Sequence, residues 1–196
     1  MLLAGVAVFT AGCHTDMWVQ PKTKPQHGSD LFADGRASRP KVPGTVARGQ
    51  NVDDPAYFTG FDPATKKLVT TIPHQRAMDT LKLKTYKEFL LHGKERFTVF
   101  CSPCHSQLGN GEGMIAQRGL KLRRPPGNYH TDRLRKMPVG HFYDVMTNGY
   151  GVMFPFASRI APEDRWAIAA YVRVLQRAND PNAGANDLGT EIDGPR

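Results

Sequence analysis

The residues best suited to chemistry lie together at Cys101-Ser102-Pro103-Cys104-His105, where two thiols and an imidazole fall within one short segment. Cys-x-x-Cys-His is the attachment signature of c-type haem. Two thiols three residues apart on a helical turn can each form a thioether with one vinyl group, and the histidine that follows can bind the iron. We therefore predict one covalent haem c, held by Cys101 and Cys104, with His105 as the proximal ligand.

Three other interpretations compete for the cysteine pair. A thioredoxin-like dithiol stands at the head of a helix in an alternating α/β pattern, and no strand alternation surrounds this pair. A zinc site needs a second pair of ligands, but no second cysteine pair is present and the other histidines never fall three to five residues apart. These histidines are His14, His27, His74, His92, His130 and His141. Chance is the third alternative.

A haem that carries electrons needs a sixth ligand, and methionine is the usual partner of histidine in cytochromes c. Met114, Met137, Met146 and Met153 follow His105 in the chain. Met146 fits an apolar helix stripe, Met137 precedes a proline at a helix start, and Met114 is only nine residues beyond His105. Met153 lies in a loop rich in glycine, aromatic residues and proline, so we predict Met153 as the second axial ligand of the iron.

Three helices are predicted around these residues. Apolar residues recur at helical spacing from about Thr85 into Cys101, again over 138–148, and again from Pro162 to about Ala178. Gly149 is placed to end the second helix, and Glu163 and Asp164 suit the first turn of the last. The predicted fold class is therefore all-α, with a helical domain over 85–178 and a polar tail over 179–196.

The chain before this domain has a different composition. Residues 14–78 contain seven prolines and no sustained period, which predicts an extended and mostly irregular arm over 13–84. Several aromatic residues distinguish this arm from a disordered linker. They are Trp18, Phe32, Tyr57, Phe58 and Phe61. We expect the arm to become ordered by contact with other proteins.

The first residues resemble an export signal. Residues 1–10 are apolar but too few to span a bilayer, and Ala11 and Gly12 precede Cys13, as in a bacterial lipobox. We predict a signal peptide over 1–12 and acylation of Cys13, which would anchor the protein to the membrane. The alternative is a secretory signal with an incidental cysteine.

The net charge of the chain is compatible with several classes of binding partner. The net charge of +8 suits nucleic acid, anionic membrane or an acidic protein surface, and the total alone does not choose among them. Basic residues concentrate over 118–136, either as a solvated loop or as a docking patch. We expect no nucleic-acid partner.

A family resemblance rests on these motifs together. The helix around Gly93 and Phe97, the Cys-x-x-Cys-His segment, the glycine-rich stretch 109–113, the methionine loop and the last helix resemble a class I cytochrome c domain. The resemblance implies that Gly93 and Phe97 meet the last helix near Trp166 and Tyr171. We also expect the other ring nitrogen of His105 to donate to a backbone carbonyl near Pro125-Pro126, because ligating imidazoles are commonly fixed this way.

A closer resemblance extends over most of the chain. Residues 31–36, 43–49, 140–142 and 164–168 are similar to the monohaem cytochrome c lipoprotein subunit of bacterial alternative complex III, although Phe154 separates Met153 from the proline that follows the methionine in that family. The resemblance implies a multihaem cytochrome c, an iron–sulfur subunit and membrane quinol-binding subunits as partners. It also implies a place on the periplasmic face of the inner membrane.

The predicted function is electron transfer from a quinol-oxidising complex to a downstream cytochrome or terminal oxidase, with no substrate chemistry and so no enzyme activity of its own. Two alternatives stay open. One is a haem enzyme of the peroxidase kind, with His105 proximal and the opposite iron face free. The other is a chiefly structural subunit whose arm holds a complex together.

Overall fold

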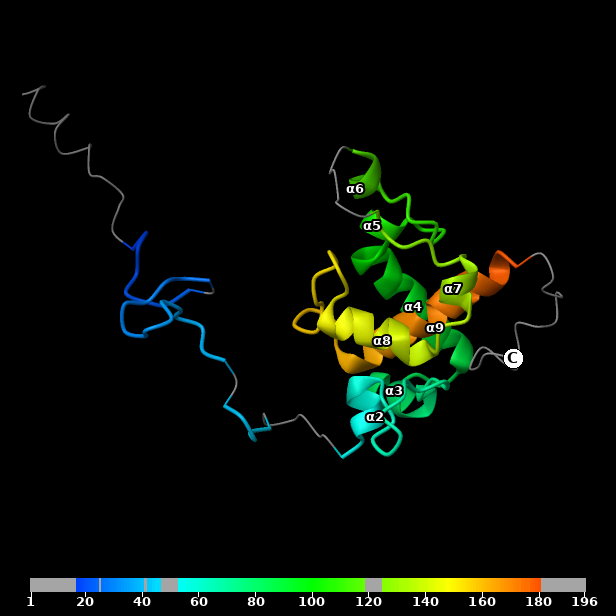
Figure 1. The fold of residues 1–196 in the computed structure, drawn as a ribbon, viewed down its shortest axis with the longest axis horizontal. Coiled ribbons are helices and arrows are strands. Elements are labelled where there is room, and N and C mark those ends of the chain that lie inside the picture. The colour runs from blue at the N-terminus through cyan, green and yellow to red at the C-terminus, as the bar shows by residue number, and fades with distance from the viewer. Residues whose placement is uncertain (1–16, 25, 41, 47–52, 119–124, 181–196) are drawn as a thin grey trace, which may run out of the picture. The chain divides into compact units, whose positions relative to one another are not determined.

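The computed structural model describes residues 17–24, 26–40, 42–46, 53–118 and 125–180, in two compact units that meet in the chain near residue 50. The described residues form helices, turns and isolated bridges but no β-strand (Figure 1). The helices are α2 (Pro55–Thr59), α3 (His74–Leu81), α4 (Tyr86–Phe100), α5 (Ser102–His105), α6 (Met114–Gln117), α7 (Asp132–Arg135), α8 (Val139–Asn148) and α9 (Pro162–Ala178). The described residues therefore have an all-α fold, as the sequence predicted.

Helices α4 and α9 form the centre of the larger unit. A capping box starts α4, with the Thr85 hydroxyl accepting from the Glu88 amide and the Glu88 carboxylate accepting from the Thr85 amide. The helices touch at Gly93, where an added Cβ would lie 2.1 Å from the carbonyl oxygen of Ala167. Only glycine permits so close an approach. Phe97 and Tyr171 then meet edge to face, with ring centroids 5.4 Å apart, as the family resemblance implied.

Helix α8 packs on the same core, and the end of α2 packs against α8. Gly140 lies against residue 60, because an added Cβ would be 2.4 Å from the Gly60 carbonyl oxygen. Tyr143 stacks on Trp166 with centroids 4.3 Å apart, and both side chains are fully buried. The three long helices therefore occupy the ranges expected from the apolar periodicity.

Residues 53–84 differ from the expectation of an extended arm with no core of its own. They form α2 and α3 and belong to the same compact unit as the haem-binding motif. Tyr57, Ile72, Ala77 and Met78 are buried in the common core. The boundary predicted at residue 84 is therefore near residue 50 in the structure, since burying these side chains stabilises the segment within its own chain.

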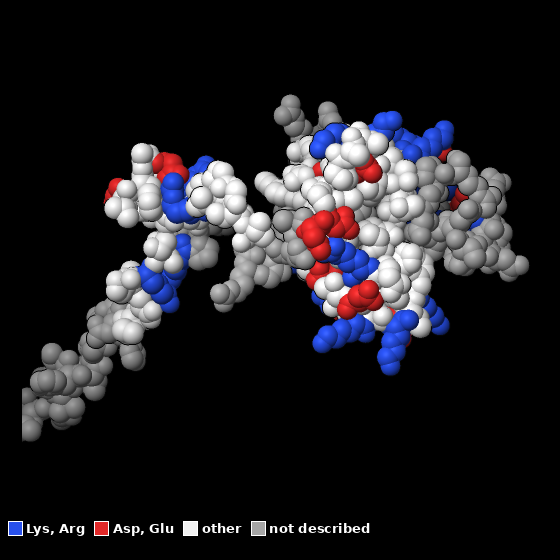
Figure 2. Space-filling view, turned by 90° about the horizontal axis from the view of Figure 1, so that it is seen from below, with Lys and Arg blue, Asp and Glu red and all other residues white. Residues whose placement is uncertain are grey.

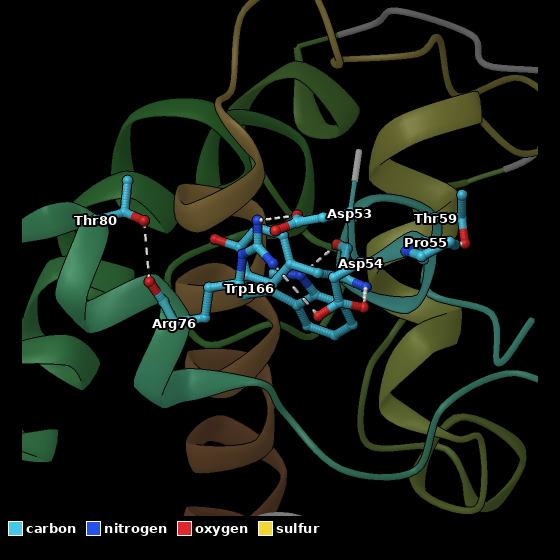
Figure 3. A network of polar contacts seen from close by, with 8 residues as sticks. Asp53, Asp54, Pro55, Thr59, Arg76, Thr80 and Trp166 are labelled. Atoms are coloured by element: carbon cyan, nitrogen blue, oxygen red, sulfur yellow. Dashed lines mark hydrogen bonds and ion pairs between the residues drawn. The ribbon is translucent and has the colours of Figure 1, made fainter. Parts of the chain in front are cut away.

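A network of polar contacts fastens this segment (Figure 3). Arg76 of α3 pairs with Asp53 at 2.9 Å and with Asp54 at 3.7 Å. Asp54 caps α2 by accepting from the Tyr57 amide at 3.1 Å. The Trp166 indole donates to the Tyr57 carbonyl oxygen at 2.8 Å, so the start of the segment is joined to the middle of the core.

The N-terminal unit is irregular where it is described, and none of its described residues is buried. A bridge joins Gly28 and Arg36, and Arg39 pairs with Asp34 at 2.7 Å while its guanidinium lies over the Phe32 ring. Trp18 and Leu31 are 73% and 82% exposed. In its described residues this part of the chain is therefore irregular, with these two apolar side chains exposed.

Several predicted features lie outside the described residues, among them the signal peptide, Cys13 and most of the tail. Within the described ranges, no helix has the length and apolar character needed to cross a membrane. On the face of the larger unit drawn in Figure 2, acidic and basic side chains lie next to one another in the middle. In the middle of this face the two signs of charge are therefore mixed.

Candidate haem site

The paired cysteines stand where α4 passes into α5. Cys101 ends α4, its amide donating to the Phe97 carbonyl oxygen at 2.9 Å, and its own carbonyl oxygen accepts from the amides of Cys104 and His105 at 3.1 and 2.8 Å. One backbone turn therefore carries both thiols and the imidazole. Cys101 is buried, Cys104 is partly buried, and both are free thiols.

The surroundings of Cys101 do not favour dithiol redox chemistry. Burial, with a smaller contribution from Cys104, raises the pKa of the Cys101 thiol to about 12. Thioredoxin-like activity depends on a thiolate stabilised at neutral pH. The Cys101 thiol is therefore protonated at neutral pH, unlike the reactive cysteine of a dithiol oxidoreductase.

His105 is fixed through one nitrogen and free at the other. Its Nδ1–H donates to the Gly127 carbonyl oxygen at 3.0 Å. This confirms the predicted bond to a backbone carbonyl oxygen, since Gly127 directly follows Pro125-Pro126. Burial lowers the pKa of His105 although the bond to Gly127 opposes this shift. The imidazole is therefore neutral at pH 7 and keeps a lone pair on Nε2, which is the form that binds a metal.

The glycine-rich stretch wraps around the end of α5. The Gly111 amide donates to the His105 carbonyl oxygen and the Gly113 amide to that of Cys104, each at 3.0 Å. An added Cβ on Gly111 would lie 2.6 Å from the Pro126 carbonyl oxygen, and one on Gly113 would lie 2.4 Å from backbone atoms of Pro103 and Cys104. These glycines let two loops close on the turn that carries His105.

Tyr129 is a site residue that the sequence did not reveal. Its ring stacks on the His105 imidazole, with centroids 4.8 Å apart and planes inclined by 20°. The contact joins residues 24 positions apart through the return of the 125–131 segment, and no motif signals it. Burial raises the pKa of Tyr129 well above its usual value, so the phenol is neutral.

The four methionines occupy different environments. Met146 is buried in the core on α8, Met114 is half exposed at the start of α6, and Met137 lies between α7 and α8 with its carbonyl oxygen bonded to Arg173. Met153 is partly buried on the loop between α8 and α9, where it packs against the core. Met153 as axial ligand stays a prediction.

The methionine loop borders an open hollow of about 580 Å³ that is lined by residues 148–155. This volume lies within the range of small-molecule and cofactor sites. Cys101, Cys104 and His105 are not among its lining residues. The structure thus brings the thiols and the imidazole together on one turn and places Met153 on a separate loop.

The basic stretch 118–136 divides into residues of different character. Arg118, Arg133 and Lys136 are exposed, whereas Arg135 is partly buried and donates to the carbonyl oxygens of His130, Gln176 and Asn179. Arg135 therefore stabilises the fold. Lys121, Arg123 and Arg124 lie outside the described residues.

The groups on this turn fit a covalent haem. Two free thiols can supply the thioethers, and a neutral imidazole with a fixed orientation can supply the iron ligand. The all-α fold and this donor set are those expected of a cytochrome c domain, a class whose chemistry is haem-based electron transfer.

The comparison with protein families supports the same class of protein. Residues 89–172 match the family model described as "Cytochrome C oxidase, cbb3-type, subunit III", which supports a place in the cytochrome c family for this part of the chain. The matched range contains Cys101, Cys104, His105 and Met153. A search of curated proteins found no match.

Proposed function

We propose that this protein is an electron carrier with a single haem c, attached through Cys101 and Cys104, and with His105 and Met153 as axial ligands. The observation that carries the proposal is the His105 ring, which shares a turn with two free thiols and whose Nδ1–H is bonded to the Gly127 carbonyl oxygen. Such a bond fixes the tautomer and makes Nε2 a stronger donor to iron.

The haem, when bound, supplies one-electron redox chemistry, and the chain supplies position and environment. Cys101 and Cys104 fix the cofactor covalently beside the core, and His105 presents Nε2 in one orientation. If His105 and Met153 both bound the iron, no coordination position would remain for a substrate. The protein would then transfer electrons and perform no further chemistry.

The thioether assignment is tested by extracting the denatured, haem-loaded protein with acidified acetone. We expect the haem to stay with the wild-type chain, and to be extracted from a double variant that carries both Cys101→Ser and Cys104→Ser, in which no thioether can form. Ser102→Ala, between the two cysteines, is the matched control and should retain the haem. Complete extraction of haem from the wild-type chain would contradict covalent attachment.

The finer assignment is a lipid-anchored subunit of a quinol-oxidising complex such as alternative complex III, on the periplasmic face of the inner membrane. The similarities over 31–36 and 140–142, and the exposed Trp18 and Leu31 of the N-terminal unit, support this assignment. A multihaem cytochrome c, an iron–sulfur subunit and membrane quinol-binding subunits would be the neighbours. A downstream cytochrome or oxidase would accept the electron.

Affinity purification from membranes tests these partners. Recovery of quinol-binding and iron–sulfur subunits is expected. Since the matched family model is named for an oxidase subunit, recovery of an oxidase core in their place would assign the protein to an oxidase. Mass spectrometry of the mature chain tests the anchor, because acylation at Cys13 requires a lipid-modified N-terminus at that residue.

A haem enzyme with an open distal face is the alternative from another class. Carbon monoxide binding to the reduced protein separates the two functions. A six-coordinate haem with histidine and methionine ligands resists carbon monoxide, whereas a peroxidase-like site binds it readily. We expect no rapid change in the visible spectrum when the reduced protein meets carbon monoxide. A third role, as a structural subunit, would show as loss of the complex after removal of the N-terminal unit.

A further inference from the structure

The His105 imidazole is contacted on an edge and on a face. The Gly127 carbonyl oxygen accepts from Nδ1 at the ring edge, and the Tyr129 ring covers one ring face at a centroid distance of 4.8 Å. A hydrogen bond at one edge leaves the imidazole free to swing about the line that joins Nδ1 to its acceptor. A flat ring against the face blocks this swing, so the two contacts together fix the plane of the imidazole.

Tyr129 is itself firmly held. Its amide donates to the Gly109 carbonyl oxygen at 2.9 Å, and its carbonyl oxygen accepts from the Gln176 side chain at 2.9 Å. Its ring also meets Phe97 and Phe142, with centroids 6.2 and 6.0 Å away. Backbone and ring are thus both restrained by the core.

The restraint extends into α9. Gln176 is 5% exposed, and its Oε1 accepts from Arg173 Nη1 at 2.7 Å. Arg173 also donates to the carbonyl oxygens of Arg135 and Met137. Burial lowers the pKa of Arg173 to about 10, which leaves it charged at neutral pH. The cation therefore orients the Gln176 amide so that its NH₂ group points to Tyr129.

We propose that Tyr129 is a positioning residue that fixes the plane of the His105 imidazole in the haem-loaded protein. This inference rests on the proposed function, in which His105 binds the iron. The plane of an axial imidazole determines which iron d orbital receives its π-electron density. That choice sets how unpaired spin spreads over the oxidised haem, and it contributes to the reduction potential.

The test compares Tyr129→Phe with Tyr129→Leu and Tyr129→Met. Phenylalanine keeps a flat aromatic ring against the imidazole, whereas leucine and methionine fill the space without one. The test needs only one of Tyr129→Leu and Tyr129→Met to fold and to bind haem. The readouts are the NMR shifts of the haem methyl groups in the oxidised protein and the midpoint potential. We expect the wild-type methyl pattern in Tyr129→Phe, and an altered order or spread of methyl shifts with a displaced potential in the others.

Tyr171→Leu is the matched control, because Tyr171 packs in the same core against Phe97 and has no recorded ring contact with His105. It should lower the thermal unfolding temperature and leave the methyl pattern unchanged. A wild-type pattern in Tyr129→Leu or Tyr129→Met would overturn the inference, and so would equal changes in Tyr129→Phe. Wild-type protein without covalent haem would instead contradict the proposed function.

Discussion

At the residue scale, the loop that carries Met153 is closed by its own backbone. The amides and carbonyl oxygens of Tyr150 and Met153 are paired at 3.0 Å in both directions. Gly149 has a φ of +80°, and an added Cβ there would lie 2.5 Å from the Met153 carbonyl oxygen. The turn therefore depends on glycine and holds the Met153 backbone in one place, as an axial ligand requires.

Met153→Ala should lower the reduction potential and abolish the sulfur-to-iron charge-transfer band of the oxidised protein, because a thioether ligand favours the reduced iron. Visible spectroscopy and a redox titration measure both effects. Met114→Ala is the control, since Met114 is 51% exposed on α6. Loss of the band in the Met114 variant and its survival in the Met153 variant would transfer the ligand role to Met114.

The two contacts of His105 differ in how far the sequence predicts them. The bond to a carbonyl near Pro125-Pro126 follows from the general need to orient a ligating imidazole, and the structure has it at Gly127. The stacking of Tyr129 does not follow, because many aromatic residues are available and only the path of the chain brings this one to the imidazole. A hydrogen bond that the chemistry of a ligand requires can be predicted from the sequence. A tertiary contact that no motif signals cannot.

At the element scale, the crossing of α4 and α9 depends on Gly93. Gly93→Ala would gain helix propensity, but its methyl group would overlap the Ala167 carbonyl oxygen and push the helices apart. We expect the free energy of unfolding to fall by about 1 to 2 kcal/mol, measured by denaturant titration. Leu91→Ala, at a 54% exposed position of the same helix, should change it by less than about 0.5 kcal/mol. An unchanged free energy of unfolding in Gly93→Ala would contradict the close approach of α4 to α9 at Gly93.

The junction between α2 and α3 should respond to acid. The hydrogen bond from Arg76 holds the pKa of Asp53 below its usual value of 3.8. Asp53 therefore adds stability above pH 3.8, and this contribution is lost as the pH falls through the lower pKa of the folded state. Asp53→Asn should lower the thermal unfolding temperature slightly at pH 7, because the pair is exposed.

The difference in unfolding temperature between wild-type protein and Asp53→Asn should shrink progressively as the pH is lowered below 3.8, as followed by circular dichroism. Gln75→Ala, on the same helix, provides a control that removes an uncharged exposed side chain. A difference that stays constant until the wild-type protein unfolds in acid would show that the charge of Asp53 is irrelevant to the junction.

The long helices and the short ones were not equally predictable. Apolar residues repeat over several turns in α4 and α9, so their ranges follow from the sequence. Helices α2 and α3 span 5 and 8 residues beside Pro55 and Pro73, which is too short for a period to emerge among breakers. Their stability comes from tertiary contacts such as the burial of Tyr57 and Met78, and those are set by the whole fold.

At the scale of the whole molecule, the position of the domain boundary can be tested by truncation. Removal of residues 1–50 should leave a folded, haem-loaded unit with an unfolding temperature close to that of the full chain. Removal of residues 1–84 should destabilise it strongly, because Tyr57, Ile72, Ala77 and Met78 leave the core. Calorimetry measures the unfolding temperatures of both truncated proteins and distinguishes the two boundaries. Equal stability of the two would restore the boundary predicted at residue 84.

The chain has two tryptophans, and the structure places one in each unit. Trp166 is fully buried with its indole bonded to the Tyr57 carbonyl oxygen, whereas Trp18 is 73% exposed. A haem in the same domain would absorb the excitation energy of Trp166 and suppress its fluorescence. The emission wavelength of the exposed Trp18 would shift if this side chain moved from water to a protein surface. The unmodified protein thus carries an optical reporter of its own assembly.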